Sequence, residues 1–303
     1  MDFLIFLEGL RNAFLDGLML AVTFLGSVEA FMVAAVIMLW CVNKRQAYYV
    51  LSVGFVGTWI CQFLKITFRI KRPWDLDPNF KAVEAAKSGA NDYSFPSGHT
   101  MNSVGTFGAI ATLTKKKLLK AVMITLCVIV PFSRMYLGVH TPLDVFTSVA
   151  IALLLIFILR PLILGHDGKY IPLIMWVMLA MSVVYLLFVE LYPFPADIQQ
   201  HNLDSAVENA YTLVGAVAGF VVVNIVDRKW VNYPVRAVWW AQLVKIVVGL
   251  ALVMGVKAGL KMPLNALFGE MPGRAVRYFC IAVTAGILWP LTFKWFSKFE
   301  KSK

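Results

Sequence analysis

The chain has 303 residues, a formal net charge of +11 and a mean hydropathy of +0.74. Apolar residues make up 60% of it and charged residues 15%, whereas a soluble domain is roughly 45–50% apolar and about 25% charged. This composition excludes a soluble globular domain, a disordered chain and a disulfide-stapled secreted module. Apolar runs of about 20 residues recur, each long enough to cross a hydrocarbon core of roughly 30 Å as a helix. The sequence therefore predicts an all-α, polytopic membrane protein.

The chain carries 28 Lys and Arg against 17 Asp and Glu. In a soluble domain such an excess would suggest a nucleic-acid partner, but no basic, aromatic-interleaved soluble segment is present to bind one. Cytoplasmic loops of membrane proteins collect Lys and Arg. We therefore expect the lipid bilayer and a membrane lipid substrate as partners, and no nucleic acid. The composition says nothing about the oligomeric state.

Residues 1–16 are predicted to form an interfacial amphipathic helix. Apolar side chains recur at helical spacing over residues 2–16, and acidic residues interrupt them. Without a basic n-region this stretch is a poor signal peptide. An apolar stripe beside a polar face suits a helix that lies in the membrane interface.

Nine transmembrane helices are predicted to follow. They are expected at residues 17–42, 47–66, 97–114, 120–137, 143–163, 170–192, 206–226, 237–256 and 276–293. The third and fourth are short and rich in small and hydroxyl residues, which suits helices that pack among other helices. All motifs with chemical content lie in a membrane core at residues 17–164, and residues 165–303 form an additional four-span region.

Loop charges predict the orientation in the membrane. The side that carries Lys44 holds 15 basic residues, among them Lys301 and Lys303, and the opposite side holds 12. Three cations on the opposite side, Lys65, Arg72 and Arg134, are assigned to a candidate site below, and without them the counts are 15 and 9. The side with more basic residues is predicted to be cytoplasmic. Nine spans then place the N-terminus outside and the C-terminus inside.

The additional region holds features that predict packing rather than chemistry. Gly215 and Gly219 have the GxxxG spacing of a helix-packing face. Glu190, Glu208 and Lys245 lie within about two turns of predicted helix ends, so their charges are expected to snorkel to the membrane interface.

A cluster of cations ends the second predicted span. Lys65, Arg69 and Arg72 are three to four residues apart, so we expect them to share one helical face. A single cationic face is what an anion site needs. The simple alternative is a solvated collar at the level of the lipid headgroups.

The third predicted span opens with a second polar motif. Ser97 follows Pro96 and is a good N-cap residue, and Gly98 lets the backbone approach a ligand closely. Free N–H groups at a helix N-terminus bind anions, although Ser97 could serve only as a cap. His99 does not follow from capping, because an imidazole that faces a membrane interior is costly without a partner.

A third motif joins the fourth and fifth predicted spans and contains Arg134 and His140. Thr141, Pro142 and Asp144 fit a helix start, with an N-cap, a first-turn proline and an acid at the third position. Asp144 could also hold one tautomer of His140 and support its positive charge. The two roles are compatible.

The predicted topology brings these three motifs to one face of the membrane. None of their Asp, Glu or His groups has the spacing of metal ligands, so we expect neither a metal nor another cofactor. A phosphate site is the simplest chemistry for this set of groups. Cations and N–H groups stabilise charge on phosphoryl oxygens, while one histidine attacks phosphorus and the other protonates the leaving oxygen.

Together the motifs resemble the three-part motif of the type 2 phosphatidic acid phosphatase superfamily, in the form of its integral-membrane lipid phosphate phosphatases. The matching patterns are Lys65-x6-Arg72-Pro73, Pro96-Ser97-Gly98-His99 and Ser133-Arg134-x5-His140-x3-Asp144. The resemblance covers about residues 17–164, and it implies a helical phosphatase core that needs no metal.

The resemblance also implies a role for each matching residue. His140 would be the nucleophile that forms a phosphohistidine, and Asp144 would orient it. His99 would be the general acid for the leaving group and then the base for water. The phosphoryl oxygens would be bound by Lys65, Arg72, Ser97, Gly98 and Arg134.

We expect the substrate to be a lipid phosphate or a polyprenyl diphosphate, hydrolysed at the extracytoplasmic or lumenal face. The third motif is similar to those of bacterial lipid phosphatases and of sphingosine-1-phosphate phosphatases. The nine-span layout is similar to that of glucose-6-phosphatase, so a sugar phosphate is an alternative substrate. The four additional spans leave a third possibility, a lipid or headgroup transporter that binds phosphate without cleaving it.

Overall fold

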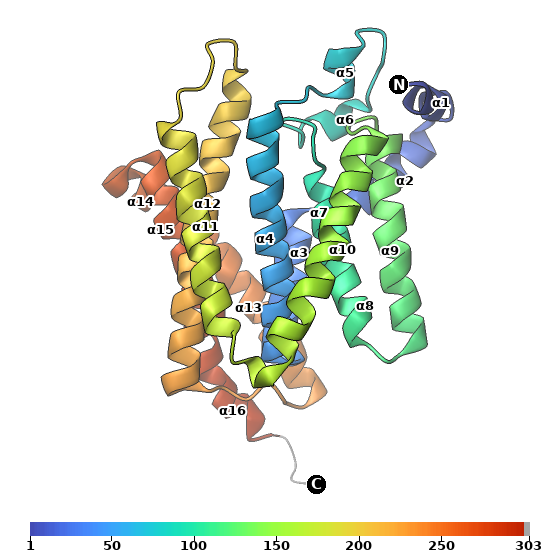
Figure 1. The fold of residues 1–303 in the computed structure, drawn as a ribbon. Helices are drawn as coiled ribbons and strands as arrows, with labels where there is room; N and C mark the ends of the chain where they lie inside the picture. Colours follow the sequence, from blue (N-terminus) through green and yellow to red (C-terminus); the bar gives the residue numbers. More distant parts are fainter. Residues whose placement is uncertain (300–303) are drawn as a thin grey trace. The chain divides into compact units, whose positions relative to one another are not determined.

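The computed structural model describes residues 1–299, so Lys301 and Lys303 of the charge count lie outside the described residues, as does the end of the predicted region 165–303. The described residues form helices and no strand (Figure 1). The α-helices are α1 (Asp2–Gly9), α2 (Ala13–Phe24), α3 (Val28–Cys41), α4 (Lys44–Phe68), α5 (Pro73–Leu76), α6 (Glu84–Lys87), α7 (Gly98–Ser103), α8 (Ala109–Leu113), α9 (Lys117–Tyr136), α10 (Pro142–Leu164), α11 (Ile171–Leu191), α12 (Gln200–Val226), α13 (Trp239–Gly259), α14 (Lys261–Phe268), α15 (Glu270–Val283) and α16 (Phe293–Ser297). Short π or 3₁₀ segments join some of them, namely η1 (Val104–Gly108), η2 (His166–Gly168), η3 (Asp227–Val231), η4 (Thr284–Leu288) and η5 (Pro290–Thr292). The predicted all-α fold is confirmed.

Each of the nine predicted spans is helical. Within the described residues, seven helices are long and apolar enough to cross a membrane, and the pair α2 and α3, bent by 46°, counts as an eighth if the two helices form one span. The remaining predicted span, 97–114, corresponds to α7, η1 and α8, which are 6, 5 and 5 residues long. Its polar side chains Thr100, Asn102, Ser103 and Thr106 are buried, as expected for a helix enclosed by other helices.

The N-terminal stretch and α9 differ from their predictions. Residues 2–16 hold two helices, because the chain breaks after α1 and Asn12 caps the start of α2 by accepting a hydrogen bond from the Leu15 N–H at 3.0 Å. Only 28% of the most apolar stretch of α9 is buried. Large apolar side chains such as Leu118 and Val128 are exposed along α9, so the small and hydroxyl residues wrongly predicted that other helices enclose it.

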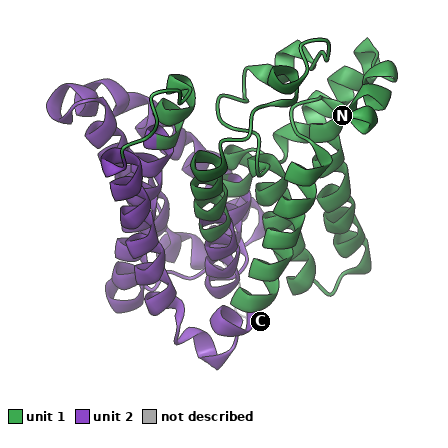
Figure 2. Ribbon diagram, turned by 45° about the horizontal axis from the view of Figure 1, so that its top comes forward, with its two compact units in different colours: residues 1–32, 56–159, 193–206 green, residues 33–55, 160–192, 207–303 purple. Residues whose placement is uncertain are grey.

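The chain forms two compact units (Figure 2). Unit 1 consists of residues 1–32, 56–159 and 193–206, and unit 2 holds residues 33–55, 160–192 and 207 onward. Helices α3, α4, α10 and α12 each contribute residues to both units. The predicted division near residue 165 stays a prediction.

Unit 1 is built around α9. Helices α1, α2, α7 and η1 all pack against it, and Figure 1 shows α9 and α10 rising side by side to the loop that joins them. Gly26, after α2, lies so close to α7 that a Cβ there would be 2.7 Å from the His99 carbonyl oxygen. This close packing fixes where α7 begins.

In unit 2 the predicted packing face of Gly215 and Gly219 is confirmed. A Cβ at Gly215 would collide with the Ala275 carbonyl, and a Cβ at Gly219 would lie 2.6 Å from the Ala282 Cβ. Backbone therefore meets backbone where α12 crosses α15, as small residues allow.

The predicted snorkelling of Lys245 is wrong. Its side chain is fully buried, with Nζ 3.1 Å from the Val235 carbonyl oxygen and 4.4 Å above the ring of Phe293. A carbonyl and an aromatic face supply the charge stabilisation that water would give. Glu208 pairs with Arg274 at 2.6 Å, and Glu190 has a side-chain hydrogen bond with Tyr211.

We predict that Gly215→Ala lowers the melting temperature of the detergent-purified protein, because the added methyl has no space between α12 and α15. Overpacking of this kind typically costs about 1–3 kcal/mol. Gly255→Ala on α13 is the matched control, since a Cβ there would meet no atom within 4 Å. Equal melting temperatures for the two variants would contradict the close packing.

Candidate active site

The first motif departs from its predicted geometry. Helix α4 ends at Phe68, and Arg69 adopts a left-handed conformation with φ of 53°. Arg72 is the N-cap of α5, because a residue that precedes proline disfavours helical geometry. The predicted shared helical face of Lys65, Arg69 and Arg72 is therefore wrong. The chain turns back instead, which brings Lys65 and Arg72 to a common partner.

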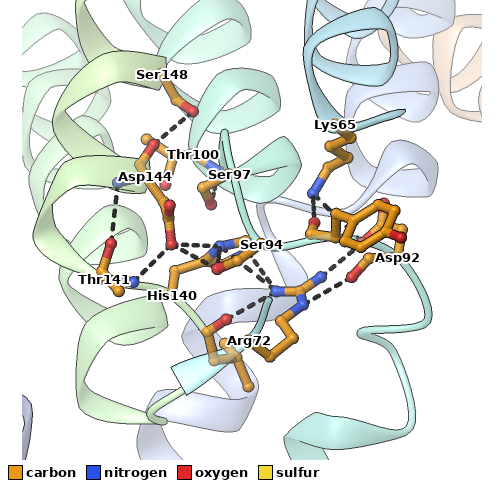
Figure 3. Close-up of polar contacts among 12 residues, drawn as sticks. Lys65, Arg72, Asp92, Ser94, Ser97, Thr100, His140, Thr141, Asp144 and Ser148 are labelled. Atoms are coloured by element: carbon orange, nitrogen blue, oxygen red, sulfur yellow. Dashed lines mark hydrogen bonds and ion pairs between the residues drawn. The ribbon is translucent and has the colours of Figure 1, made fainter. Parts of the chain in front are cut away.

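That partner is Asp92, in the loop that follows α6. Its Oδ1 lies 2.6 Å from Arg72 Nη2 and 3.4 Å from Lys65 Nζ, and its carbonyl oxygen accepts from Arg72 Nε at 2.9 Å (Figure 3). Lys65 also donates to the Tyr93 carbonyl. Burial alone would raise the pKa of Asp92, but the charges of Lys65 and Arg72 outweigh burial and lower the pKa to about 2. Asp92 was missed because it lies outside every motif.

Arg72 also reaches His140. Its Nη1 donates to the Val139 carbonyl at 2.7 Å and lies 3.0 Å from His140 Nε2. Nη1 is also 3.4 Å from His140 Nδ1, so Arg72 contacts both ring nitrogens, and it is the Asp144 carboxylate, an acceptor, that favours a proton on Nδ1. Nδ1 lies 3.5 Å from Asp144 Oδ2. This tautomer leaves a lone pair on Nε2, as a nucleophile requires.

Asp144 is held from three directions. Its Oδ2 accepts from Ser94 Oγ at 2.6 Å and from the Thr141 N–H at 2.7 Å, while its own N–H donates to Thr141 Oγ1 at 3.3 Å. The last two bonds form a capping box at the start of α10. Helix capping and histidine orientation therefore coexist, as the sequence allowed. Ser94 carried no spacing signal and was missed as a partner of Asp144.

The start of α7 is fixed against the start of α10. Ser97 is the N-cap, and its side chain accepts from the Thr100 N–H at 3.4 Å. The Ser97 N–H donates to the Asp144 carbonyl at 3.2 Å. A Cβ at Gly98 would meet no atom within 4 Å. The Cα of Gly98 therefore faces open space on the side where other residues carry a side chain.

Arg134 and His99 are the last two residues of the predicted set. Arg134, in the last turn of α9, donates to Thr23 Oγ1 of α2 at 2.7 Å, and its Nε has no hydrogen-bond partner among the described residues. His99 interacts electrostatically with Arg134, Asp92 and Arg72. Thr23, which only the fold brings to this position, was missed.

The surroundings keep His140 neutral. Burial is the largest influence, followed by the positive charges of Arg72, Arg134 and Lys65, and together they lower the pKa of His140 well below its ordinary value. A neutral imidazole beside buried cations suits attack on an anionic phosphoryl group, whose charge the cations would balance.

A polar cavity of about 220 Å³ adjoins the cationic cluster. Its lining includes Arg72, Asp92 and also Lys71, which directly precedes Arg72. Three further lining residues lie around the start of α12, namely Gln199, His201 and Asn202. Asn202 is 3% exposed, donates from Nδ2 to Gln199 Oε1 at 2.6 Å, and has no described partner for Oδ1. No motif in the sequence pointed to Gln199, His201 and Asn202 as lining residues.

The residues described hold no group of three or more His, Cys, Asp and Glu side chains that could bind a metal ion. They do bring together buried cations, an open helix N-terminus and a neutral histidine oriented by a carboxylate. This arrangement can bind a tetrahedral oxyanion and attack its central atom.

We predict that Asp92→Asn increases the stabilisation of the protein by inorganic phosphate. The substitution removes the carboxylate that occupies Lys65 and Arg72, so an added anion meets less competition. A ligand at about 100 times its Kd stabilises the fold by about 2.7 kcal/mol. Melting temperatures with and without phosphate measure the effect. Asp77→Asn, in the loop between α5 and α6, is the control, and an equal phosphate response of both variants would contradict the prediction.

Comparisons with known proteins agree with this arrangement. The model of the PAP2 superfamily matches residues 45–165, and the model described as PAP2 superfamily phosphatase, transmembrane extension, matches residues 211–301. No solved structure matches the chain.

Curated relatives include three phosphatases. A probable sphingosine-1-phosphate phosphatase of Dictyostelium discoideum is 30% identical over 163 residues, 48% of this chain and 38% of the relative. Phosphatidylglycerophosphatase B of Bacillus subtilis is 36% identical over 88 residues, 26% of this chain and 41% of the relative. Undecaprenyl-diphosphatase of Sulfolobus acidocaldarius is 46% identical over 54 residues, 18% of this chain and 26% of the relative. The chain thus spans less than half the length of each relative.

Proposed function

The chain belongs to the PAP2 superfamily, and from this premise we propose that it is a metal-independent, multi-pass membrane phosphatase. The proposed reaction is hydrolysis of a lipid phosphate or polyprenyl diphosphate at the extracytoplasmic or lumenal face, through a phosphohistidine at His140. One observation carries the proposal. His140 has Nε2 beside Arg72 and Nδ1 directed to Asp144, within a cluster of buried cations.

Substrate binding begins with exchange of anions. Lys65 and Arg72 are occupied by Asp92 in this structure. An incoming phosphoryl group takes over these cations and gains Arg134, Ser97 and the Gly98 N–H as further donors. Asp92 keeps the two cations in place until a ligand arrives, and its release from Arg72 accompanies binding.

Two displacements then complete the reaction. His140 Nε2 attacks phosphorus, the bond from phosphorus to the leaving oxygen breaks, and His99 gives that oxygen a proton. His99 next takes a proton from water, whose oxygen attacks phosphorus and breaks the P–N bond, releasing inorganic phosphate. Asp144 stabilises the positive charge that develops on the His140 ring in the first step.

The remainder of the substrate lies in the polar cavity beside Arg72. Asn202 Oδ1 is an acceptor that a headgroup hydroxyl or amine can satisfy, and His201 and Gln199 offer further polar contacts. The names of the relatives point to lipid substrates. One substrate assay also tests the two alternatives, namely hydrolysis of a sugar phosphate and binding of phosphate without hydrolysis.

We predict that the wild-type protein releases phosphate in the presence of EDTA and that His140→Ala abolishes this release. The assay offers detergent-solubilised phosphatidic acid, phosphatidylglycerol phosphate, undecaprenyl diphosphate, sphingosine-1-phosphate and glucose-6-phosphate. His166→Ala, in the loop between α10 and α11, is the control and should retain full activity. Wild-type turnover by His140→Ala would exclude the mechanism, and fastest turnover of glucose-6-phosphate would replace the lipid substrate by a sugar. Phosphate binding without release from any substrate would favour a transporter.

We predict that His99→Ala separates the two steps of the reaction. Loss of a general acid slows release of a lipid alcohol by about 10²–10⁴-fold. A p-nitrophenolate leaving group needs no proton, so the variant should still transfer phosphate to His140 from p-nitrophenyl phosphate. Hydrolysis then lacks its base, and acid-labile phosphohistidine should accumulate on the protein. Equal slowing with both leaving groups would contradict the role of His99 as the acid.

We predict that kcat/KM stays high at pH values well below the ordinary histidine pKa of 6.5. The nucleophile must be unprotonated, and a lowered pKa keeps it so to lower pH. The profile of kcat/KM reports the free enzyme, in which the cations are not yet balanced by substrate. An acid limb near pH 6.5, after correction for ionisation of the substrate, would show that His140 does not experience these charges.

A further inference from the structure

Unit 2 contains a larger cavity, with several charged side chains in its lining, that the proposed reaction does not use. Its volume is about 530 Å³, within the range of small-molecule sites. It lies at the end of α13 and the starts of α12, α14 and α15. The charged side chains that line it are Glu208, Lys257, Lys261, Glu270, Arg274 and Arg277.

Helical spacing gathers these groups on two facing surfaces. Lys257, Lys261 and Asn265 follow one another at intervals of four residues along α13 and α14, while Arg274 and Arg277 lie on the facing side of α15. Helices α14 and α15 approach closely, since a Cβ at Gly273 of α15 would lie 2.7 Å from the carbonyl oxygen of Leu264 in α14.

The charge of the cavity is not balanced. Four basic side chains face two acidic ones, a formal excess of +2. Glu208 Oε2 is already engaged by Arg274, at 2.6 Å from Nη2 and 2.7 Å from Nη1. This pair leaves a net positive lining around the remaining space.

Two buried polar atoms in the cavity wall lack partners. Arg277 is 7% exposed, and its Nε has no hydrogen-bond partner among the described residues. Asn265 Oδ1 is likewise buried without a described partner. An unpaired guanidinium donor is costly when buried, and a phosphate oxygen is its best acceptor. The Asn265 oxygen can accept from a hydroxyl of the same ligand.

We propose that this cavity is a second anion site, which binds a phosphate group carried by a lipid headgroup or present as free inorganic phosphate. Arginine and lysine side chains bind phosphate oxygens through charge-assisted hydrogen bonds, whichever molecule carries the phosphate. Arg277 is the anchor of the site, and Lys261 at its rim adds charge. The site is independent of the proposed hydrolysis, because none of its residues belongs to the three motifs.

The test measures binding to the purified full-length protein. The lipid probe is phosphatidylglycerol, a phosphodiester with free hydroxyls, counted by native mass spectrometry beside zwitterionic phosphatidylcholine. The second probe is radiolabelled inorganic phosphate, counted by equilibrium dialysis. The variants are Arg277→Gln and Lys261→Gln, and Lys116→Gln, exposed in the loop before α9, is the charge-matched control.

We expect Arg277→Gln to weaken phosphatidylglycerol binding about tenfold and Lys261→Gln to weaken it less, with Lys116→Gln unchanged. If Arg277→Gln loses one bound phosphate per chain and its lipid binding does not change, free phosphate is the ligand. Binding of both probes that is unchanged in Arg277→Gln and Lys261→Gln would overturn the proposal, as would an equal loss in Lys116→Gln. If Arg277→Gln does not fold, Lys261→Gln decides alone. Hydrolysis by all variants is assayed separately, so failure of the proposed function leaves this result intact.

Discussion

The guanidinium group of Arg72 holds the candidate active site together. It donates to Asp92, to the Val139 carbonyl and toward Nε2 of His140, so one side chain links the loop before α7 with the loop before α10. A buried arginine needs its five donors satisfied, and its planar fork fixes the direction of each partner. The position of the proposed nucleophile follows from this one requirement, and Asp144 beside Nδ1 orients its ring.

The second constraint is the need to keep several cations together in a buried place. Lys65, Arg72 and Arg134 are each at most 5% exposed, and like charges repel strongly where water is excluded. Asp92 relieves that repulsion for two of them and Thr23 gives Arg134 a neutral partner. The candidate site therefore contains a carboxylate that already balances part of its positive charge, and in the proposed reaction a phosphoryl group would have to displace it.

Sequence reasoning was strongest where local chemistry determines local structure. The N-cap at Ser97, the capping box of Thr141 and Asp144, and the GxxxG contact of Gly215 follow from backbone rules, and all three are present. It failed at Arg69 and Arg72, because α4 ends at Phe68 and Pro73 disfavours helical geometry at Arg72, and at Lys245, where burial replaced snorkelling. Asp92, Ser94 and Thr23 were missed because only tertiary folding makes them partners of motif residues.

The wall of the polar cavity at Gln199, His201 and Asn202 falls between the two regions that match family models, which end at residue 165 and begin again at 211. In the proposed reaction this wall faces the part of the substrate that leaves, and it lies outside the stretch that holds all three motifs. A chain shortened to residue 165 would keep the motifs and lose the wall. Under the proposal such a chain would keep its contacts with the phosphoryl group and lose those with the leaving part.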